Sequence, residues 1–92
     1  MKYGIKRTKA FDKDIRLARK RGKDLSKLNT VVDLLASGQR LPERYHEHAL
    51  TGEWRGHMEC HVEPDWLLLY YFLDDTLVLT LVRNGTHSDL FK

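Results

Sequence analysis

Hydrophobic residues in the first third of the chain recur at the spacing of an amphipathic helix. Phe11, Ile15 and Ala18 lie three or four residues apart, which predicts one apolar stripe along a helix. Thr8 is a suitable N-cap for this helix, and Gly22 is placed to end it. The first helix is therefore expected between these two residues, with the stripe facing a core.

A second helix is predicted over residues 24–37, and the short link between the two helices favours an αα-hairpin. A short strand over residues 2–6 is expected before the hairpin. Residues 39–52 follow it as an irregular connector, in which Leu41-Pro42 opposes continuation of a helix.

From residue 53 onward the hydrophobic period changes to the alternation of β-strands. Strands are predicted over residues 53–62, 66–73 and 76–83. The connections between them are short and polar, so these strands should pair antiparallel. Asn84-Gly85 is expected to end the sheet, and residues 86–92 are too few for a further element of consequence.

The order of these elements predicts a single α+β domain over residues 1–92. The N-terminal strand and the helical hairpin should pack on one face of a small antiparallel β-sheet. The opposite face is then free to hold a functional site.

Charge divides the chain into two unlike parts. Residues 1–28 contain eleven Lys or Arg and three Asp, a balance of +8, whereas residues 29–92 contain five Lys or Arg and ten Asp or Glu, a balance of −5. Basic residues of the first helix also fall almost opposite its apolar stripe, and we call them the basic ridge: Lys9, Lys13, Arg16 and Lys20. The ridge is suited to contacts with phosphates, although an ordinary solvated helix face is the alternative.

Composition excludes several classes of protein. No apolar run is long enough to cross a membrane, and the N-terminus lacks the apolar core of a signal peptide, so a cytoplasmic location is expected. The single cysteine, Cys60, excludes an internal disulfide and suits a reducing compartment.

Polar residues of the second half permit cleavage of RNA without a metal. Such a reaction needs a base for the ribose 2′-hydroxyl, an acid for the departing 5′-oxygen and a cation beside the phosphorus. The candidate catalytic residues are His48, His61, Asp65, Arg83 and His87. Trp66 and Phe91 are candidates for stacking on bases.

Each of these residues also has an ordinary structural explanation. His61 and Asp65 can hydrogen-bond across the turn that they flank. Arg83 can be a solvated or salt-bridged arginine at the end of a strand. His87 and Phe91 can simply hold the C-terminal tail against the core.

Two other kinds of function stay open at this point. A zinc site has potential donors in His46, His48, His57, Cys60 and His61. Strand alternation, however, places Cys60 on the opposite face from its neighbours, so no metal is expected. A non-enzymatic RNA-binding or partner-binding module would explain the basic ridge but not the histidines.

Three segments of the second half, taken together, resemble the YafQ-type toxins of the RelE/ParE superfamily. They are His48-Ala49-Leu50 with Gly52-Glu53-Trp54-Arg55-Gly56, then HVEPDWLLLY from His61 to Tyr70, and RNGTHSDLF from Arg83 to Phe91. Two positions depart from the family pattern. Ala49 stands where proline is expected, and His57 stands where an aromatic residue is expected, on the same strand face as His61.

The resemblance implies a microbial-RNase-like (RelE-like) fold and a type II toxin that cleaves mRNA in the decoding site of the 70S ribosome, without a cofactor. It also implies a cognate antitoxin, typically with a ribbon-helix-helix part, that neutralises the toxin. Operator DNA would be reached only through the toxin–antitoxin complex, and no membrane is involved.

The resemblance further implies roles for particular residues. His87 is expected as the general acid and His61 or Asp65 as the general base, with His48 completing the set and Arg83 at the phosphate. Trp66 and Phe91 would hold the substrate, and the basic ridge would dock on ribosomal RNA. The alternative within the superfamily is a ParE-like toxin, which acts on DNA gyrase and needs no such histidines.

Overall fold

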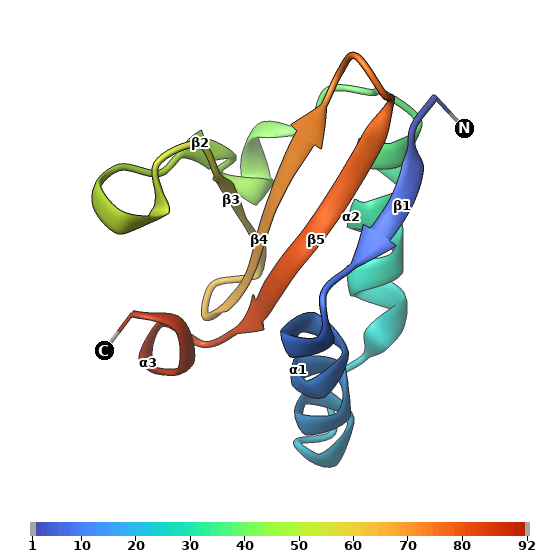
Figure 1. The fold of residues 1–92 in the computed structure, drawn as a ribbon. Helices are drawn as coiled ribbons and strands as arrows, with labels where there is room; N and C mark the ends of the chain where they lie inside the picture. Colours follow the sequence, from blue (N-terminus) through green and yellow to red (C-terminus); the bar gives the residue numbers. More distant parts are fainter. Residues whose placement is uncertain (1, 92) are drawn as a thin grey trace.

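A computed structural model describes residues 2–91 as a five-stranded sheet with two long helices on one face (Figure 1). The elements in chain order are β1 (Gly4–Arg7), α1 (Lys9–Lys20), α2 (Leu25–Ala36), the 3₁₀ turn η1 (Glu43–Tyr45), β2 (His48–Ala49), the 3₁₀ turn η2 (Gly52–Trp54), β3 (Met58–Glu63), β4 (Trp66–Leu73), β5 (Val78–Gly85) and α3 (His87–Leu90). The predicted α+β architecture is confirmed.

The sheet has the strand order β1-β5-β4-β3-β2. Strands β2 to β5 pair antiparallel, as expected from their short connections. Strand β1 instead joins the outer edge of β5 in parallel. The sheet is therefore mixed rather than wholly antiparallel, because the helical hairpin separates β1 from the strands that follow it.

The helical hairpin forms as predicted because both of its helices carry side-chain caps. The hydroxyl of Thr8 accepts a hydrogen bond from the backbone N–H of Phe11 at 3.0 Å, and a carboxylate oxygen of Asp24 accepts from that of Ser26 at 3.0 Å. Gly22 ends the first helix with a φ of 76°, a left-handed conformation that glycine adopts without steric cost.

The main hydrophobic core lies between the helices and the sheet. Strand β4 is buried on both faces, as predicted for a central strand: Trp66, Leu68 and Tyr70 pack in the main core. Leu67 and Leu69 pack on the other face in a smaller cluster with Leu90. The face opposite the helices is thus partly covered by α3 and η2, and the remainder carries the polar residues considered below.

Two sequence predictions about element ends are wrong. Residues 52–54 form a 3₁₀ turn, so β3 begins at Met58 rather than at residue 53. Asn84 does not break the sheet: its backbone N–H donates to Asp14 at 3.1 Å, and its amide oxygen accepts from the indole N–H of Trp66 at 3.2 Å. These long-range hydrogen bonds hold Asn84 in β5.

The tail also forms a short helix, α3, that was not predicted from the sequence. In α3, the Thr86 hydroxyl accepts from the backbone N–H of Asp89, and the Asp89 carboxylate accepts from that of Thr86. This capping box stabilises even a single helical turn. None of the helices within residues 2–91 is long and apolar enough to cross a membrane.

Candidate active site

A buried glutamate joins two of the predicted histidines at the edge of the sheet. Glu59 and His61 lie on the same side of β3 two residues apart, and His48 on β2 lies opposite Glu59 in the register. One carboxylate oxygen of Glu59 lies 3.0 Å from Nε2 of His48 and 3.2 Å from Nε2 of His61. The Glu59 side chain is only 6% exposed and is hydrogen-bonded to His48, so the contacts of this cluster, His48–Glu59–His61, are pre-formed.

The second ring nitrogen of His61 is also constrained. Its Nδ1 lies 3.3 Å from the backbone carbonyl of Pro64, in the turn that links β3 to β4. A carbonyl can only accept, so Nδ1 carries a proton, and Nε2 is the nitrogen that faces Glu59.

His87 is held by a carboxylate from the same turn. A single oxygen of Asp65 accepts from the backbone N–H of His87 at 2.8 Å and contacts its ring Nδ1 at 2.6 Å. The backbone hydrogen bond, followed by that to the ring, holds the pKa of Asp65 below its ordinary value. Asp65 is therefore a carboxylate that orients the His87 ring.

The two histidine–carboxylate units adjoin one another. The ring centroids of His61 and His87 lie 5.8 Å apart, and those of His48 and His61 lie 6.4 Å apart. His46, which the sequence analysis considered only as a metal donor, lies 5.6 Å from His61. The structure thus brings four of the five predicted catalytic residues, His48, His61, Asp65 and His87, to one edge of the sheet.

The fifth predicted residue, Arg83, lies apart from the row of histidine rings, which consists of His46, His48, His61 and His87. Its guanidinium forms a two-pronged ion pair with Asp14 of α1, through Nε at 2.7 Å and Nη2 at 3.0 Å. Asp14 raises the pKa of Arg83 and fixes its orientation. The guanidinium lines a hollow of about 640 Å³ together with three residues of the basic ridge: Lys13, Arg16 and Lys20.

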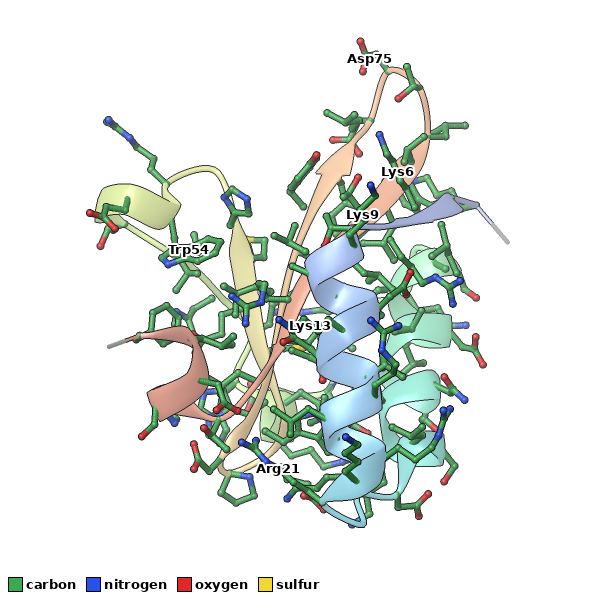
Figure 2. All side chains as sticks on the ribbon, turned by 60° about the horizontal axis from the view of Figure 1, so that its bottom comes forward. Lys6, Lys9, Lys13, Arg21, Trp54 and Asp75 are labelled. Atoms are coloured by element: carbon green, nitrogen blue, oxygen red, sulfur yellow. The ribbon has the colours of Figure 1, made fainter. Side chains whose placement is uncertain are left out.

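The short helix that carries His87 is anchored to the end of α1. Arg21 donates two hydrogen bonds to Asp89, at 2.6 and 3.1 Å. Arg21 itself lies at the C-terminal end of α1 (Figure 2). The ion pair lowers the pKa of Asp89, which also caps α3. His87 is thereby positioned from both sides, by Asp65 and by α1.

The predicted stacking role of Trp66 is wrong. Its side chain is 2% exposed, lies in the main core and donates to Asn84, so it presents no face to a substrate. Phe91 is 36% exposed and packs edge-on against Trp54 at 6.4 Å. Trp54 is only half-buried and supplies the aromatic surface that Trp66 does not.

Of the metal donors suggested by the sequence, the structure brings His46, His48 and His61 together but leaves Cys60 and His57 apart from them. Cys60 is buried on the helix side, where burial raises the pKa of its thiol to about 12. His57 packs between Trp54 and Tyr71, at 5.3 Å from each ring, rather than beside His61. The ligand atoms of His48, Glu59 and His61 do lie within 4.8 Å of one another, a spacing that can hold a metal ion.

Similarity to known proteins identifies the family to which this chain belongs. The family model that describes bacterial toxins of type II toxin–antitoxin systems, YafQ, matches residues 3–92. The chain belongs to the YafQ toxin family.

Individual YafQ proteins and related toxins support this assignment. The mRNA interferase toxin YafQ of Escherichia coli K12 is 44% identical over 82 residues, covering 88% of this chain and 87% of its own. The crystal structure of YafQ from E. coli BL21(DE3) has a TM-score of 0.92 and 40% identity, with 98% and 99% of the two chains covered.

Two further structures of this fold contain a partner or a metal. The E. coli DinJ–YafQ toxin–antitoxin complex has a TM-score of 0.89 and 40% identity, with both chains fully covered (100%). A metal-bound toxin from Helicobacter pylori has a TM-score of 0.91 and 43% identity, covering 97% and 99% of the chains.

Sequence reasoning missed two carboxylates of this YafQ-family site. Glu59 shares the polar face of its strand with His61, two residues away, so strand alternation offered a signal. Asp14 offered none, because its partner Arg83 is 69 residues distant.

Proposed function

We propose that this YafQ-family toxin is an endoribonuclease that cuts mRNA on the ribosome by metal-independent acid–base catalysis. The observation that carries the proposal is the pair of adjoining histidine–carboxylate units, one able to take a proton and the other able to give one. The E. coli K12 relative, described as an mRNA interferase, supports the substrate class.

In the proposed reaction, the His48–Glu59–His61 cluster removes the proton from a ribose 2′-hydroxyl. The 2′-oxygen attacks the adjacent phosphorus, and the bond from phosphorus to the 5′-oxygen breaks. The imidazolium of His87, oriented by Asp65, gives its proton to that leaving oxygen. The products are a 2′,3′-cyclic phosphate and a 5′-hydroxyl, so the proton count balances without a metal.

With His87 as the acid and Asp65 as its partner, His61 is a better candidate for the base than Asp65. Asp65 already makes two hydrogen bonds with His87. Nε2 of His61 instead faces the buried carboxylate of Glu59, which can share the proton that His61 takes. Because the Glu59 carboxylate lies at Nε2 itself, the proton taken from the ribose would be shared between His61 and Glu59.

The basic ridge and the Arg83 hollow form one cationic surface beside α3, and we assign it to RNA phosphates. Lys9, Lys13, Arg16 and Lys20 are all exposed. Lys9 and Lys13 follow one another along α1 in Figure 2. Phosphate contacts of this kind position a nucleic acid without reading its sequence, which suits docking on ribosomal RNA.

A cognate antitoxin is the proposed protein partner. The family is defined by type II toxin–antitoxin systems, and the E. coli relative forms a complex with DinJ. We propose that the antitoxin of this chain, of ribbon-helix-helix type, neutralises it and carries the complex to operator DNA.

A second proposal concerns metal ions. We propose that His48, Glu59 and His61 can also bind a divalent transition metal, since their donor atoms already converge and a related H. pylori toxin is metal-bound. An ion at this position would occupy the base and inhibit cleavage.

The test of the endoribonuclease proposal is to map mRNA 5′ ends after brief induction of wild type and His87→Ala. Loss of the general acid should lower cleavage by roughly 10²- to 10⁴-fold. Ser88→Ala, an exposed neighbour on the same helix, should cut normally. Wild-type cleavage by a folded His87→Ala protein would overturn the proposal, and DNA damage with intact transcripts would favour the ParE-like alternative.

A further inference from the structure

The row of imidazoles has two distinct ends, and a hollow opens at each. His46 and His48 are neighbours of His61, with ring centroids at 5.6 and 6.4 Å, and all three line one hollow. His87, which is held by Asp65, is a further neighbour of His61 at 5.8 Å and does not line that hollow. His61 is therefore the shared neighbour of a base end and an acid end.

Cleavage of RNA through the 2′-hydroxyl has a direction. The base acts on the nucleotide that lies 5′ of the cut, and the acid acts on the 5′-oxygen of the nucleotide that lies 3′ of it. With His61 as base and His87 as acid, the 5′ nucleotide must extend toward His46, and the 3′ nucleotide must extend along α3.

The hollow at the base end has the size and the lining of a nucleotide site. Its volume is about 670 Å³, within the range of small-molecule sites. Aliphatic and aromatic side chains form its walls and two cations stand beside them: Val62, Pro64, Tyr45, His46, Lys27 and Arg44.

Charge in this hollow favours an anionic ligand. Its one acidic group, Glu63, is neutralised by Lys23 and Lys27, each at 2.9 Å, and these contacts lower the pKa of Glu63. Arg44 lies over the Tyr45 ring at 4.7 Å and keeps its charge at the surface. A flat base and a phosphate can thus be accommodated together.

His46 occupies this hollow through an uncommon backbone conformation. Its φ of 49° and ψ of 48° lie in the left-handed region, which residues other than glycine seldom adopt. This turn ends η1 and brings the exposed imidazole edge-on to His61. One face of the His46 ring is therefore available to a base beside the reacting ribose.

The hollow at the acid end is also aromatic. It measures about 600 Å³ and is lined by Trp54, His57, Leu90, Phe91 and Glu53. Phe91 follows His87 by four residues, so it lies one helical turn beyond the proposed acid. Figure 2 shows Trp54 on the side of the sheet where α3 lies.

We propose that the His46 hollow binds the base on the 5′ side of the cut by stacking on the His46 ring, whereas the Trp54–Phe91 hollow receives the base on the 3′ side. This inference rests on the proposed endoribonuclease function and adds the direction in which mRNA crosses the site. His46 is then a substrate-binding residue, not an acid or a base.

The test uses purified ribosomes programmed with three short mRNAs: one intact, one lacking the base 5′ of the cut, and one lacking the base 3′ of it. Single-turnover cleavage is measured for wild type, His46→Asn and Phe91→Ala. Asparagine tolerates the left-handed conformation, so His46→Asn should keep the fold. Removal of one stacking interaction should lower cleavage of intact mRNA about tenfold.

The expected result is a crossed pattern. His46→Asn should cut the mRNA without the 5′ base as fast as wild type does, but should keep its tenfold defect on the mRNA without the 3′ base. Phe91→Ala should show the reverse.

Other outcomes separate the two proposals. An equal defect of His46→Asn on all three mRNAs, no defect at all, or coupling to the 3′ base would each overturn the subsite assignment. His87→Ala serves as the control for the reaction itself. If His87→Ala cuts like wild type, the endoribonuclease proposal fails. If His87→Ala is inactive but the defect of His46→Asn does not depend on the 5′ base, only the subsite assignment fails.

Discussion

Asp14 and Arg83 form a two-pronged ion pair that joins the middle of α1 to β5, with nitrogen–oxygen distances of 2.7 and 3.0 Å. The Asp14 side chain is only 10% exposed, and it also accepts from the backbone N–H of Asn84. Asp14 thus holds in place both the proposed phosphate-binding arginine and the strand that leads to His87.

Replacing Asp14 by Asn should therefore reduce stability and cleavage together. The half-buried guanidinium of Arg83 loses its charged partner, which costs about 1–3 kcal/mol of unfolding free energy. Chemical unfolding and single-turnover cleavage would measure the two effects. Asp12→Asn, which removes only an exposed partner of Arg7, is the matched control and should change neither appreciably. A stable Asp14→Asn protein with full activity would contradict this role.

The Arg21–Asp89 pair should make stability depend on pH. Asp89 has a lowered pKa in the folded chain, so its contribution is fully present above the ordinary aspartate pKa of about 3.9 and is lost as the pH falls through the folded value. We expect Asp89→Asn to lower the unfolding free energy by about 1 kcal/mol at pH 7. The difference from wild type should shrink below about pH 4.

Urea unfolding of both proteins at pH 7 and at pH 3 would measure this dependence. Asp75→Asn, in the exposed β4–β5 turn (Figure 2), should change the unfolding free energy little at either pH. A pH-independent difference for Asp89→Asn would mean that its carboxylate charge does not hold α3 in place.

Trp66→Phe should act on stability and leave substrate binding alone. The substitution removes the hydrogen bond to the amide oxygen of buried Asn84, whose amide nitrogen already has no partner within residues 2–91. The expected loss is about 1–3 kcal/mol of unfolding free energy, with an unchanged KM for mRNA. Phe91→Ala should instead raise KM with little loss of stability. A raised KM for Trp66→Phe would contradict this prediction and would support the contact between Trp66 and the substrate that the sequence suggested.

The basic ridge should contribute to the salt dependence of cleavage. Removal of one phosphate-binding cation should reduce the slope of log activity against log salt concentration by roughly 0.7–0.9. Replacing Lys13 and Arg16 by Gln should therefore flatten the slope, measured at subsaturating ribosome concentration. Arg40→Gln removes an exposed charge outside the ridge and should leave it unchanged. Equal slopes for all three proteins would exclude docking through the ridge.

Metal binding at His48, Glu59 and His61 can be measured without the ribosome and its magnesium. Calorimetry of the isolated protein with Zn²⁺ or Cu²⁺ should detect one site, which Glu59→Gln weakens at least tenfold. His57→Ala, a histidine outside the cluster, should bind as wild type does. Added metal should inhibit cleavage, and a chelator should restore it. Equal affinity for Glu59→Gln would place the ion elsewhere.

The sequence by itself determined most of the elements and selected the candidate catalytic residues. The change of hydrophobic period located the helical hairpin and the strands, because burial of one face imposes its period on neighbouring residues. Capping residues fixed where the helices begin, since their hydrogen bonds reach only two or three residues along the chain. His48, His61, Asp65 and His87 were selected by their chemistry and by the family resemblance.

Only the tertiary structure decided how these residues combine. It paired His61 with Glu59 and His87 with Asp65, separated Arg83 from the histidines through Asp14, buried Trp66 and exposed Phe91. It also turned His46 toward the row and formed α3 from a tail of only a few residues. Such contacts join residues distant in the chain, and strand register and helix packing, not local spacing, set which side chains meet.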